Sequence, residues 1–322
     1  MARYNSLSPG LWFRAGTLRT VRMSKTSPLI DYSDRLEIAL ALKTDLGEGP
    51  IWDASTKGLV FVDSNSGDIH RFDLKQKQVS TINVGCTIGV AIPRARGGYI
   101  VTSTNGVLSV DPSAGRVGLL VPIEEELPNN RMNDGKCDSR GRLWSGTLSV
   151  NFERNAGALY RVDPDLSVTL CVDDVRISNG IAWSPNDRLM YYNDTLAHGI
   201  DVFDYDIEDG IVSNRRRFAE IDRDAGLPDG MTVDAEGCVW VALFKGGQIR
   251  RYNPGGEWIG VVNLPVSRVT SCNFGGDDLE DLYITTADLR LHDDGMPHEP
   301  KAGYLFLCRP GVAGLPSHPF AG

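Results

Sequence analysis

The chain has 322 residues, of which 41% are hydrophobic and 23% charged, a balance typical of folded proteins with a large apolar core. Its formal net charge of −9 argues against a broad surface for nucleic acid or anionic membrane, because both need clustered positive charge. No apolar run approaches the length that spans a bilayer, and six scattered cysteines without a CxxC pair argue against a disulfide framework or a zinc cluster. We therefore expect a cytoplasmic protein.

The N-terminal stretch differs from the rest of the chain. Residues 1–30 carry five basic side chains and no acid, a composition that is compatible with an organelle transit peptide. We favour a different interpretation, a flexible leader or an upstream start with Met23 as the true beginning. The expected organisation is a flexible or processed extension over residues 1–32 and one domain over residues 33–322.

Residues 36–42 (LEIALAL) form an apolar stretch just ahead of the repeats described next. We expect an outer strand that pairs with residues 303–310 (GYLFLCRP), because this pairing would cover an exposed sheet edge. A helix is the alternative, since Leu, Glu and Ala favour one.

From about residue 46 a motif recurs that consists of a polar residue, usually Gly, and a short apolar strand. Its openings read GEGPIWD, IGVAIPR, NDGKCDSRG, SNGIAWSPN, PDGMTVDAEG and TSCNFGG. A second and a third strand follow each opening, as in GRLWSGT and GALYRVDP. The openings recur at intervals of about 40 to 50 residues, which is typical of propeller blades. We therefore predict an all-β fold, a six-bladed β-propeller with four-stranded blades around a central channel.

The first strand of each blade lines the channel, so equivalent positions should converge around its axis. The residues that precede the six equivalent positions are Glu48, Ile88, Asp134, Asn179, Asp229 and Thr270. Four of these six are Glu, Asp or Asn. Carboxylates that cluster in a confined mouth are costly unless a cation or a proton compensates them.

Glu48, Asn179 and Asp229 supply hard oxygen ligands, which suit Ca²⁺, Mg²⁺ or Mn²⁺, with Zn²⁺ as a further option. Asp-Gly and Asn-Gly are also common turn dipeptides, so any one of these residues alone indicates only a turn. The coincidence in register across blades is what favours a metal site.

Four motifs together resemble the senescence marker protein-30/gluconolactonase/regucalcin-like family of six-bladed propeller lactonases. They read LGEGPIWD, RMNDGKCDSRGRLWSGT, ISNGIAWSPN and LPDGMTVDAEGCVWVA, and the resemblance covers residues 44 to 309. It implies one divalent metal held by Glu48, Asn179 and Asp229. It also implies that Arg131 and Asn133 contact a sugar lactone, such as glucono-, xylono- or arabinono-lactone, which is hydrolysed to the aldonic acid.

One position departs from the family. Many relatives place an acid that contacts substrate shortly after the GT of RLWSGT, whereas this chain has LSVN there, with Asn151 nearest that position. Asn151 is therefore a third candidate for substrate binding, and the departure puts the sugar preference in doubt.

The chemistry expected of such a site is hydrolysis of a cyclic ester whose carbonyl oxygen binds an open position on the metal. Asp229 is the candidate base that takes a proton from the attacking water, with Asp134 as the alternative. Two other functions stay open, a metal-dependent phosphotriesterase or other esterase, and a non-catalytic calcium-binding propeller. Arg131 and Asn133 beside the metal argue against the last, because an ion store needs neither. A monomer is the default, and the partner is the small-molecule lactone.

Overall fold

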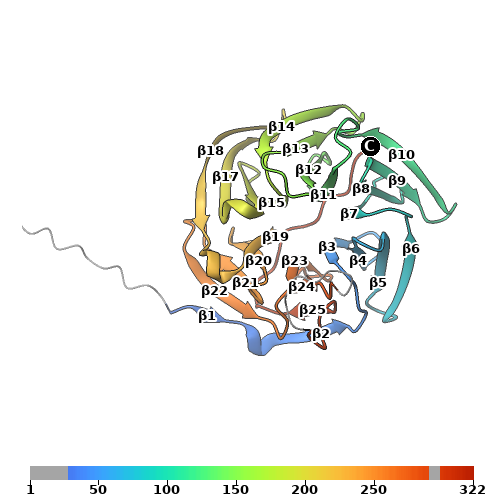
Figure 1. Cartoon of the computed structure of the whole chain (residues 1–322). Coiled ribbons are helices and arrows are strands. Elements are labelled where there is room, and N and C mark those ends of the chain that lie inside the picture. The colour runs from blue at the N-terminus through green and yellow to red at the C-terminus, as the bar shows by residue number, and fades with distance from the viewer. Residues whose placement is uncertain (1–27, 290–297) are drawn as a thin grey trace, which may run out of the picture.

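The computed structural model describes residues 28–289 and 298–322. Short runs of β-branched and aromatic residues, such as those of Tyr99–Ser103, form strands because such side chains pack well on a pleated surface. The strands make six sheets that stand as blades around a common axis (Figure 1). The predicted six-bladed propeller with four-stranded blades is confirmed.

The first three blades each take four consecutive strands, which run outward from the axis. Blade 1 contains β3 (Gly47–Asp53), β4 (Gly58–Asp63), β5 (Asp68–Asp73) and β6 (Gln78–Asn83). Blade 2 contains β7 (Ile88–Pro93), β8 (Tyr99–Ser103), β9 (Gly106–Asp111) and β10 (Arg116–Pro122). Blade 3 contains β11 (Asn130–Cys137), β12 (Leu143–Ser149), β13 (Gly157–Val162) and β14 (Val168–Val175).

The other three blades follow the same order, with two N-terminal strands added at outer edges. Blade 4 contains β15 (Ser178–Trp183), β16 (Leu189–Asp194), β17 (Gly199–Asp206) and β18 (Ile211–Glu220). Blade 5 contains β19 (Leu227–Val233), β20 (Val239–Phe244), β21 (Gln248–Tyr252), β22 (Trp258–Asn263) and β1 (Ile30–Asp31). Blade 6 contains β23 (Val269–Gly275), β24 (Asp281–Thr286), β25 (Leu305–Cys308) and β2 (Leu36–Leu40).

The ring closes through its N-terminal strand. β2 pairs antiparallel with β25, with Leu36 opposite Cys308 and Leu40 opposite Leu305. The predicted pairing of residues 36–42 with residues 303–310 is therefore confirmed, and it covers an edge that would otherwise be open.

The strand β1 lies on the neighbouring blade. It pairs parallel with β22, and the ring of Tyr32 lies 5.4 Å from that of Trp240. Contact with the propeller thus begins before residue 33, within the stretch that the sequence analysis assigned to the extension. The rest of that extension, residues 1–27, lies outside the described residues.

Helices are few and short in the described part of the chain. They are the 3₁₀ turns η1 (Ser33–Arg35), η2 (Thr195–Ala197) and η3 (Arg223–Ala225). Within residues 28–289 and 298–322, no helix has the length and apolar character needed to cross a membrane.

Aromatic side chains fill the space between blades. Trp144 and Trp240 are completely buried, and Trp52 and Trp183 are 6% and 8% exposed. Trp144 of blade 3 meets Trp183 of blade 4 edge to face, with ring centroids 6.4 Å apart. The four tryptophans therefore help to pack the blades against one another.

Each innermost strand departs from regular pairing near its start. The register shifts between these residue pairs: Glu48 and Ile51, Ile88 and Ala91, Met132 and Gly135, Ser178 and Ile181, Pro228 and Met231, Val269 and Ser271. Such bulges re-aim side chains away from the ladder. They also bring adjacent strands very close, since a Cβ on Gly180 would lie 2.5 Å from the carbonyl oxygen of Asp229. This approach explains why Gly follows the polar residue in the repeated motif.

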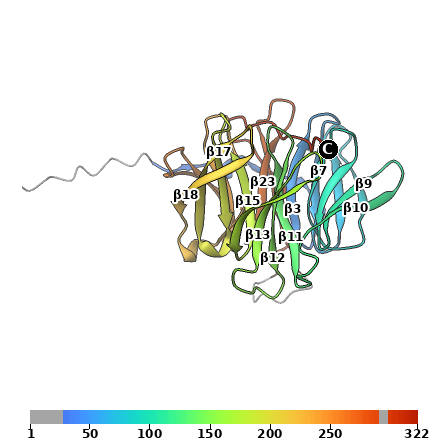
Figure 2. The same cartoon turned by 90° about the horizontal axis from the view of Figure 1, so that it is seen from above.

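The opposite ends of the innermost strands face the C-terminal segment, residues 309–322. The backbone of this segment bonds to turns of four blades, for example from Gly314 N to Leu279 O and from Ala321 N to Gly141 O. Phe320 is completely buried in the apolar core. The segment crosses one face of the ring, as the red trace in Figure 1 shows, and Figure 2 gives the edge-on view.

Candidate metal centre and active-site cavity

A cavity of about 700 Å³ lies where the innermost strands begin. Its polar lining residues come from four blades and are Glu48, Asn65, Arg131, Asn133, Asn179, Thr195, Asp229 and Lys245. Among the sequence-predicted site residues, the structure brings together Glu48, Asn179, Asp229, Arg131 and Asn133 in this one cavity. Only Asn151 is absent from its lining.

Local hydrogen bonds hold the three candidate ligands. Asn179 Nδ2 donates to Thr195 Oγ1 at 3.1 Å, and the amide of Asn193 donates to the carbonyl oxygen of Asp229 at 2.6 Å. The backbone N–H of Gly49 donates to Glu48 Oε2 at 3.2 Å. These bonds fix the side chain of Asn179 and the backbone of Asp229 before any ligand arrives.

Two oxygens of the cavity floor are left without a hydrogen-bond partner among the described residues. They are Asn179 Oδ1 and Asp229 Oδ1, on residues that are only 5% and 6% exposed. Buried polar atoms without partners are rare, because each costs free energy that a hydrogen bond or a bound ion would recover. Together with the Glu48 carboxylate, these oxygens form the donor set that hard divalent cations prefer. The residues present therefore fit a divalent cation.

The charges in the cavity floor also favour a bound cation. Removal from bulk water raises the pKa of Glu48 well above its ordinary value, and the nearby Asp229 and Asp134 raise it further. Burial likewise raises the pKa of Asp229, with Asp134 as the next cause. In the metal-free protein, protonation thus relieves a repulsion that a cation would relieve instead.

Asp134 does not occupy the position at the channel mouth that the repeat register predicted for it. Where pairing resumes after the bulge, Asn133 lies two residues upstream, like Asn179 and Asp229 in their blades. Asp134 is 8% exposed and does not line the cavity, and its Oδ1 accepts a bond from Gly135 N at 2.7 Å. Its carboxylate adds negative charge next to the cavity, and burial raises its pKa.

Arg131 and Asn133 form a braced pair on the cavity wall. Arg131 Nη1 donates to Asn133 Oδ1 and to Met132 O, both at 3.0 Å. Asn133 Nδ2 donates to Ser178 O at 2.8 Å, and Thr102 Oγ1 donates to Asn133 O at 3.0 Å. The pair is thus anchored to blades 2 and 4, and such pre-organisation reduces the cost of orienting a ligand.

The structure places Asn151 outside the cavity. It is exposed in the turn after β12, and its two neighbours Val150 and Phe152 line the cavity instead. This apolar part of the lining and the supporting roles of Asn193 and Thr195 were not predicted from the sequence. The apolar run LSV around the departing position was a signal that could have indicated it.

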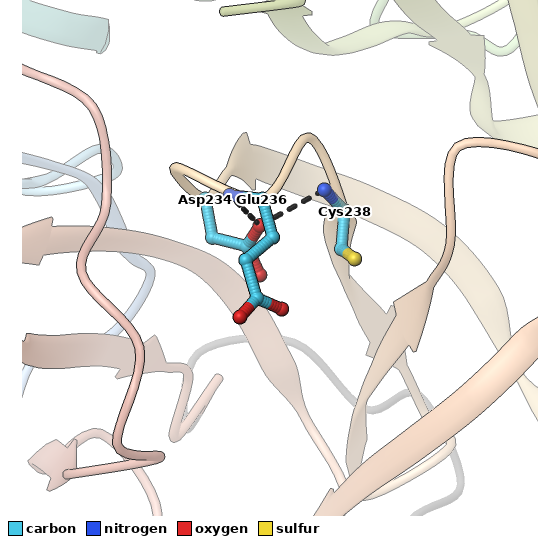
Figure 3. A group of neighbouring side chains, drawn as sticks. All are labelled: Asp234, Glu236 and Cys238. Atoms are coloured by element: carbon cyan, nitrogen blue, oxygen red, sulfur yellow. Dashed lines mark hydrogen bonds between the residues drawn. The ribbon is translucent and has the colours of Figure 1, made fainter.

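A second group of possible metal ligands lies at the far end of β19, where Asp234, Glu236 and Cys238 lie close together (Figure 3). Asp234 Oδ1 accepts from the backbone N–H of Glu236 and of Cys238 at 3.0 and 2.9 Å. Its Oδ2 accepts from Trp240 Nε1 at 2.8 Å and from Arg251 Nη2 at 2.6 Å. Because the oxygens of Asp234 already have donors and a cationic partner, this group stabilises the turn after β19.

Comparison with known proteins places the whole propeller in one family. Residues 46–288 match the model described as the SMP-30/Gluconolactonase/LRE-like region. The chain is 37% identical to regucalcin of Danio rerio over 294 residues, which cover 90% of this chain and 99% of that protein.

Two solved structures share the architecture over almost the whole chain. A luciferin-regenerating enzyme is 31% identical, with a TM-score of 0.84 over 89% of this chain and 99% of its own. The regucalcin of Agrobacterium tumefaciens, a calcium-binding protein, is 25% identical, with a TM-score of 0.86 over 92% and 100%. The chain belongs to the SMP-30/gluconolactonase/LRE-like family.

Proposed function

We propose that this protein is a divalent-metal-dependent lactonase that opens a cyclic ester to the hydroxy acid. One observation carries the proposal. Two buried oxygens that lack a partner in the described part of the chain, Asn179 Oδ1 and Asp229 Oδ1, share a cavity with a second carboxylate and with the braced pair Arg131 and Asn133. The family membership agrees with it, since the matching family model carries gluconolactonase in its description.

Glu48, Asn179 and Asp229 are the residues that would hold the cation. Their oxygens suit Ca²⁺, Mg²⁺ or Mn²⁺ best, and Zn²⁺ less well because no His or Cys lines the cavity in the described residues. When bound, a divalent cation supplies Lewis-acid polarisation of an ester carbonyl and compensates the two carboxylates.

The protein's own residues would orient the lactone and move the proton. The Arg131 guanidinium has donors beyond the one that bonds Asn133, and these can hold the ester oxygens of the substrate. Asp229, besides holding the cation, would accept the proton of the attacking water through its carboxylate. The ester C–O bond would then break, and the ring oxygen would leave as the alcohol by taking back the proton that Asp229 accepted.

The name and description of the relatives favour one alternative, an ion-binding protein without catalysis. The Agrobacterium tumefaciens relative is described as a calcium-binding protein. A pure ion site, however, does not explain why the cavity extends to Arg131 and Asn133, which are braced against one another beside the floor.

The test is a metal-resolved activity screen. Chelator-treated protein is supplied in turn with Ca²⁺, Mg²⁺, Mn²⁺ and Zn²⁺, and proton release is followed with glucono-, xylono-, arabinono- and galactono-lactone and with a phosphotriester. We expect lactone hydrolysis that depends on the added metal. Tight calcium binding by calorimetry, with no ester hydrolysed under any metal, would establish the ion-binding alternative instead.

A further inference from the structure

The wall of the cavity has a different character from its floor. More than half of the lining residues are apolar, including Leu46, Val150, Phe152, Leu196, Phe244 and Leu289. They come from blades 1, 3, 4 and 5 and from the residues after β24, so they form the upper wall around the polar floor. A lactone bound at the floor would therefore have apolar side chains beside it.

Two of these side chains are unusually exposed for their type. Val150 is 50% and Phe152 64% exposed, although both lie at a cavity. Exposed apolar side chains that gather at one concave place mark a surface that binds something apolar. When only water fills the cavity, these apolar side chains stay exposed to solvent at a cost in free energy.

The backbone also holds Phe152 in place at a cost. Its φ angle is 55°, in the left-handed region that bulky residues avoid, and its N–H closes a tight turn to Ser149 O at 2.9 Å. The turn keeps the Phe152 ring at the cavity, while Asn151 lies outside its lining.

Several polar groups of the floor already have hydrogen-bond partners inside the protein. Asn133 uses its amide for Ser178 and its side-chain oxygen for Arg131, and Asn65 Nδ2 donates to Asp45 Oδ2 at 2.6 Å. A sugar lactone with several hydroxyl groups needs many directed partners, because each buried hydroxyl without one is costly. The apolar wall supplies none.

We propose that the preferred substrate is a lactone with an apolar substituent, an alkyl chain or an aromatic ring, rather than an unsubstituted sugar lactone. The inference rests on the proposed lactonase function. The ester occupies the floor beside Arg131, and the substituent packs on Val150, Phe152 and the leucines of the wall. The volume of about 700 Å³ is in the range that encloses a ligand well beyond a single ring.

The test is a matched series of γ-lactones, from γ-butyrolactone to a heptyl-substituted γ-lactone, compared with D-glucono-1,5-lactone. With the metal that gives the highest activity, we expect kcat/KM to rise about threefold to fourfold per added methylene over the first few carbons. The longer lactones should exceed the sugar lactone. A kcat/KM that stays flat with chain length, or is highest for the sugar lactone, overturns the inference.

A matched pair of variants assigns the effect to the wall. Asparagine tolerates the left-handed backbone, so Phe152→Asn should fold and lower kcat/KM for the heptyl lactone about tenfold more than for γ-butyrolactone. The control is Leu170→Ser on β14, a residue that is 54% exposed and remote from the cavity lining, and it should change neither. Equal losses for both lactones in Phe152→Asn would overturn the role of the wall.

A binding measurement separates this inference from the proposed function. γ-Lactams with the same substituents resist hydrolysis, and their affinity can be measured by calorimetry with the cation present. If no lactone is hydrolysed but lactam affinity rises with chain length, the lactonase proposal fails and the apolar site stands. If lactones are hydrolysed while neither rate nor affinity depends on chain length, the lactonase stands and the apolar site is overturned.

Discussion

The two ends of β19 each carry a buried aspartate, and the two differ in what surrounds their carboxylates. Asp234 just beyond the strand end is completely buried and accepts bonds from two backbone N–H groups, Trp240 and Arg251. Asp229 near the strand start is 6% exposed and has an oxygen with no partner among the described residues. Proximity of acids alone therefore does not distinguish the two ends as candidate metal sites, whereas an unpartnered oxygen that faces the cavity does.

The hydrogen-bonded turn of Asp234 has a counterpart in blade 3. Asp138 takes the place of Asp234, with Arg142 Nε, Trp144 Nε1 and Tyr205 Oη donating to its Oδ2 at 2.7, 3.0 and 2.6 Å. The turns of blades 3 and 5 thus share one hydrogen-bonded arrangement that locks the turn, whereas the opposite strand ends in blades 4 and 5 carry the oxygens of Asn179 and Asp229 that have no partner among the described residues.

The largest expected effect comes from replacing each of the two aspartates in turn by asparagine. Asp229→Asn should lose the bound divalent cation and lower kcat/KM for the best lactone by about a hundredfold to a thousandfold, as expected when a preorganised charge-stabilising group is lost. Asp234→Asn should retain one metal per folded molecule. Metal content by atomic emission, measured beside the rate, checks both; a metal-loaded and fully active Asp229→Asn would remove it from both proposed roles.

The second effect is on the stability of the fold, which should depend on Asp234. Asp234→Asn leaves the Arg251 guanidinium, 7% exposed, without its closest counter-charge, and breaking a buried ion pair in this way costs about 3 to 5 kcal/mol. Urea unfolding measures this loss. Glu236→Gln is the matched control, because Glu236 bonds the same arginine at 2.7 Å but is 65% exposed, so its loss should cost at most about 1 kcal/mol. Similar losses in both variants would contradict the comparison.

The third effect is a pH dependence confined to the floor. Folding raises the pKa values of Glu48 and Asp229, so both groups stabilise the metal-free fold at acidic pH, below their unfolded pKa values. That stability is lost as the pH rises toward the folded pKa values, at about 1.4 kcal/mol per pH unit for each carboxyl.

The measurement compares the wild type with Glu48→Gln/Asp229→Asn in the absence of metal. The unfolding free energy of the wild type should fall relative to that of the double variant as the pH rises above about 4. A saturating divalent cation should abolish the decline in the wild type alone. A difference between the two proteins that is constant with pH would show that the floor carboxyls titrate normally.

Much of this architecture could be predicted because the same sequence motif recurs in each blade. The Gly after Glu48, Asn179 and Asp229 is required by the close approach of the neighbouring innermost strand, so the repeat register carried these three residues into one cavity. The closing strand was predictable for a similar reason, since an apolar stretch ahead of the first repeat had one open edge to cover.

The parts of the site that could not be predicted depend on features that do not recur from blade to blade. The bulge in β11 takes up both Asn133 and Asp134, so counting from the following Gly assigned the ring position to Asp134 where the register gives Asn133. The apolar wall comes from connections between strands, such as the turn at Phe152, whose conformation no strand period specifies.

The smallest expected effect concerns Asn151, where the resemblance and the geometry disagree. Because the side chain lies outside the cavity lining, Asn151→Asp should change kcat/KM by no more than about twofold, as is usual for surface substitutions. The measurement is kcat/KM for D-glucono-1,5-lactone and for the heptyl γ-lactone. A tenfold or larger gain for the sugar lactone alone would mean that an acid at this position reaches the substrate, as in many relatives. The turn at Phe152 would then have to rearrange when substrate binds, because its present conformation turns two apolar side chains to the cavity and excludes the residue between them.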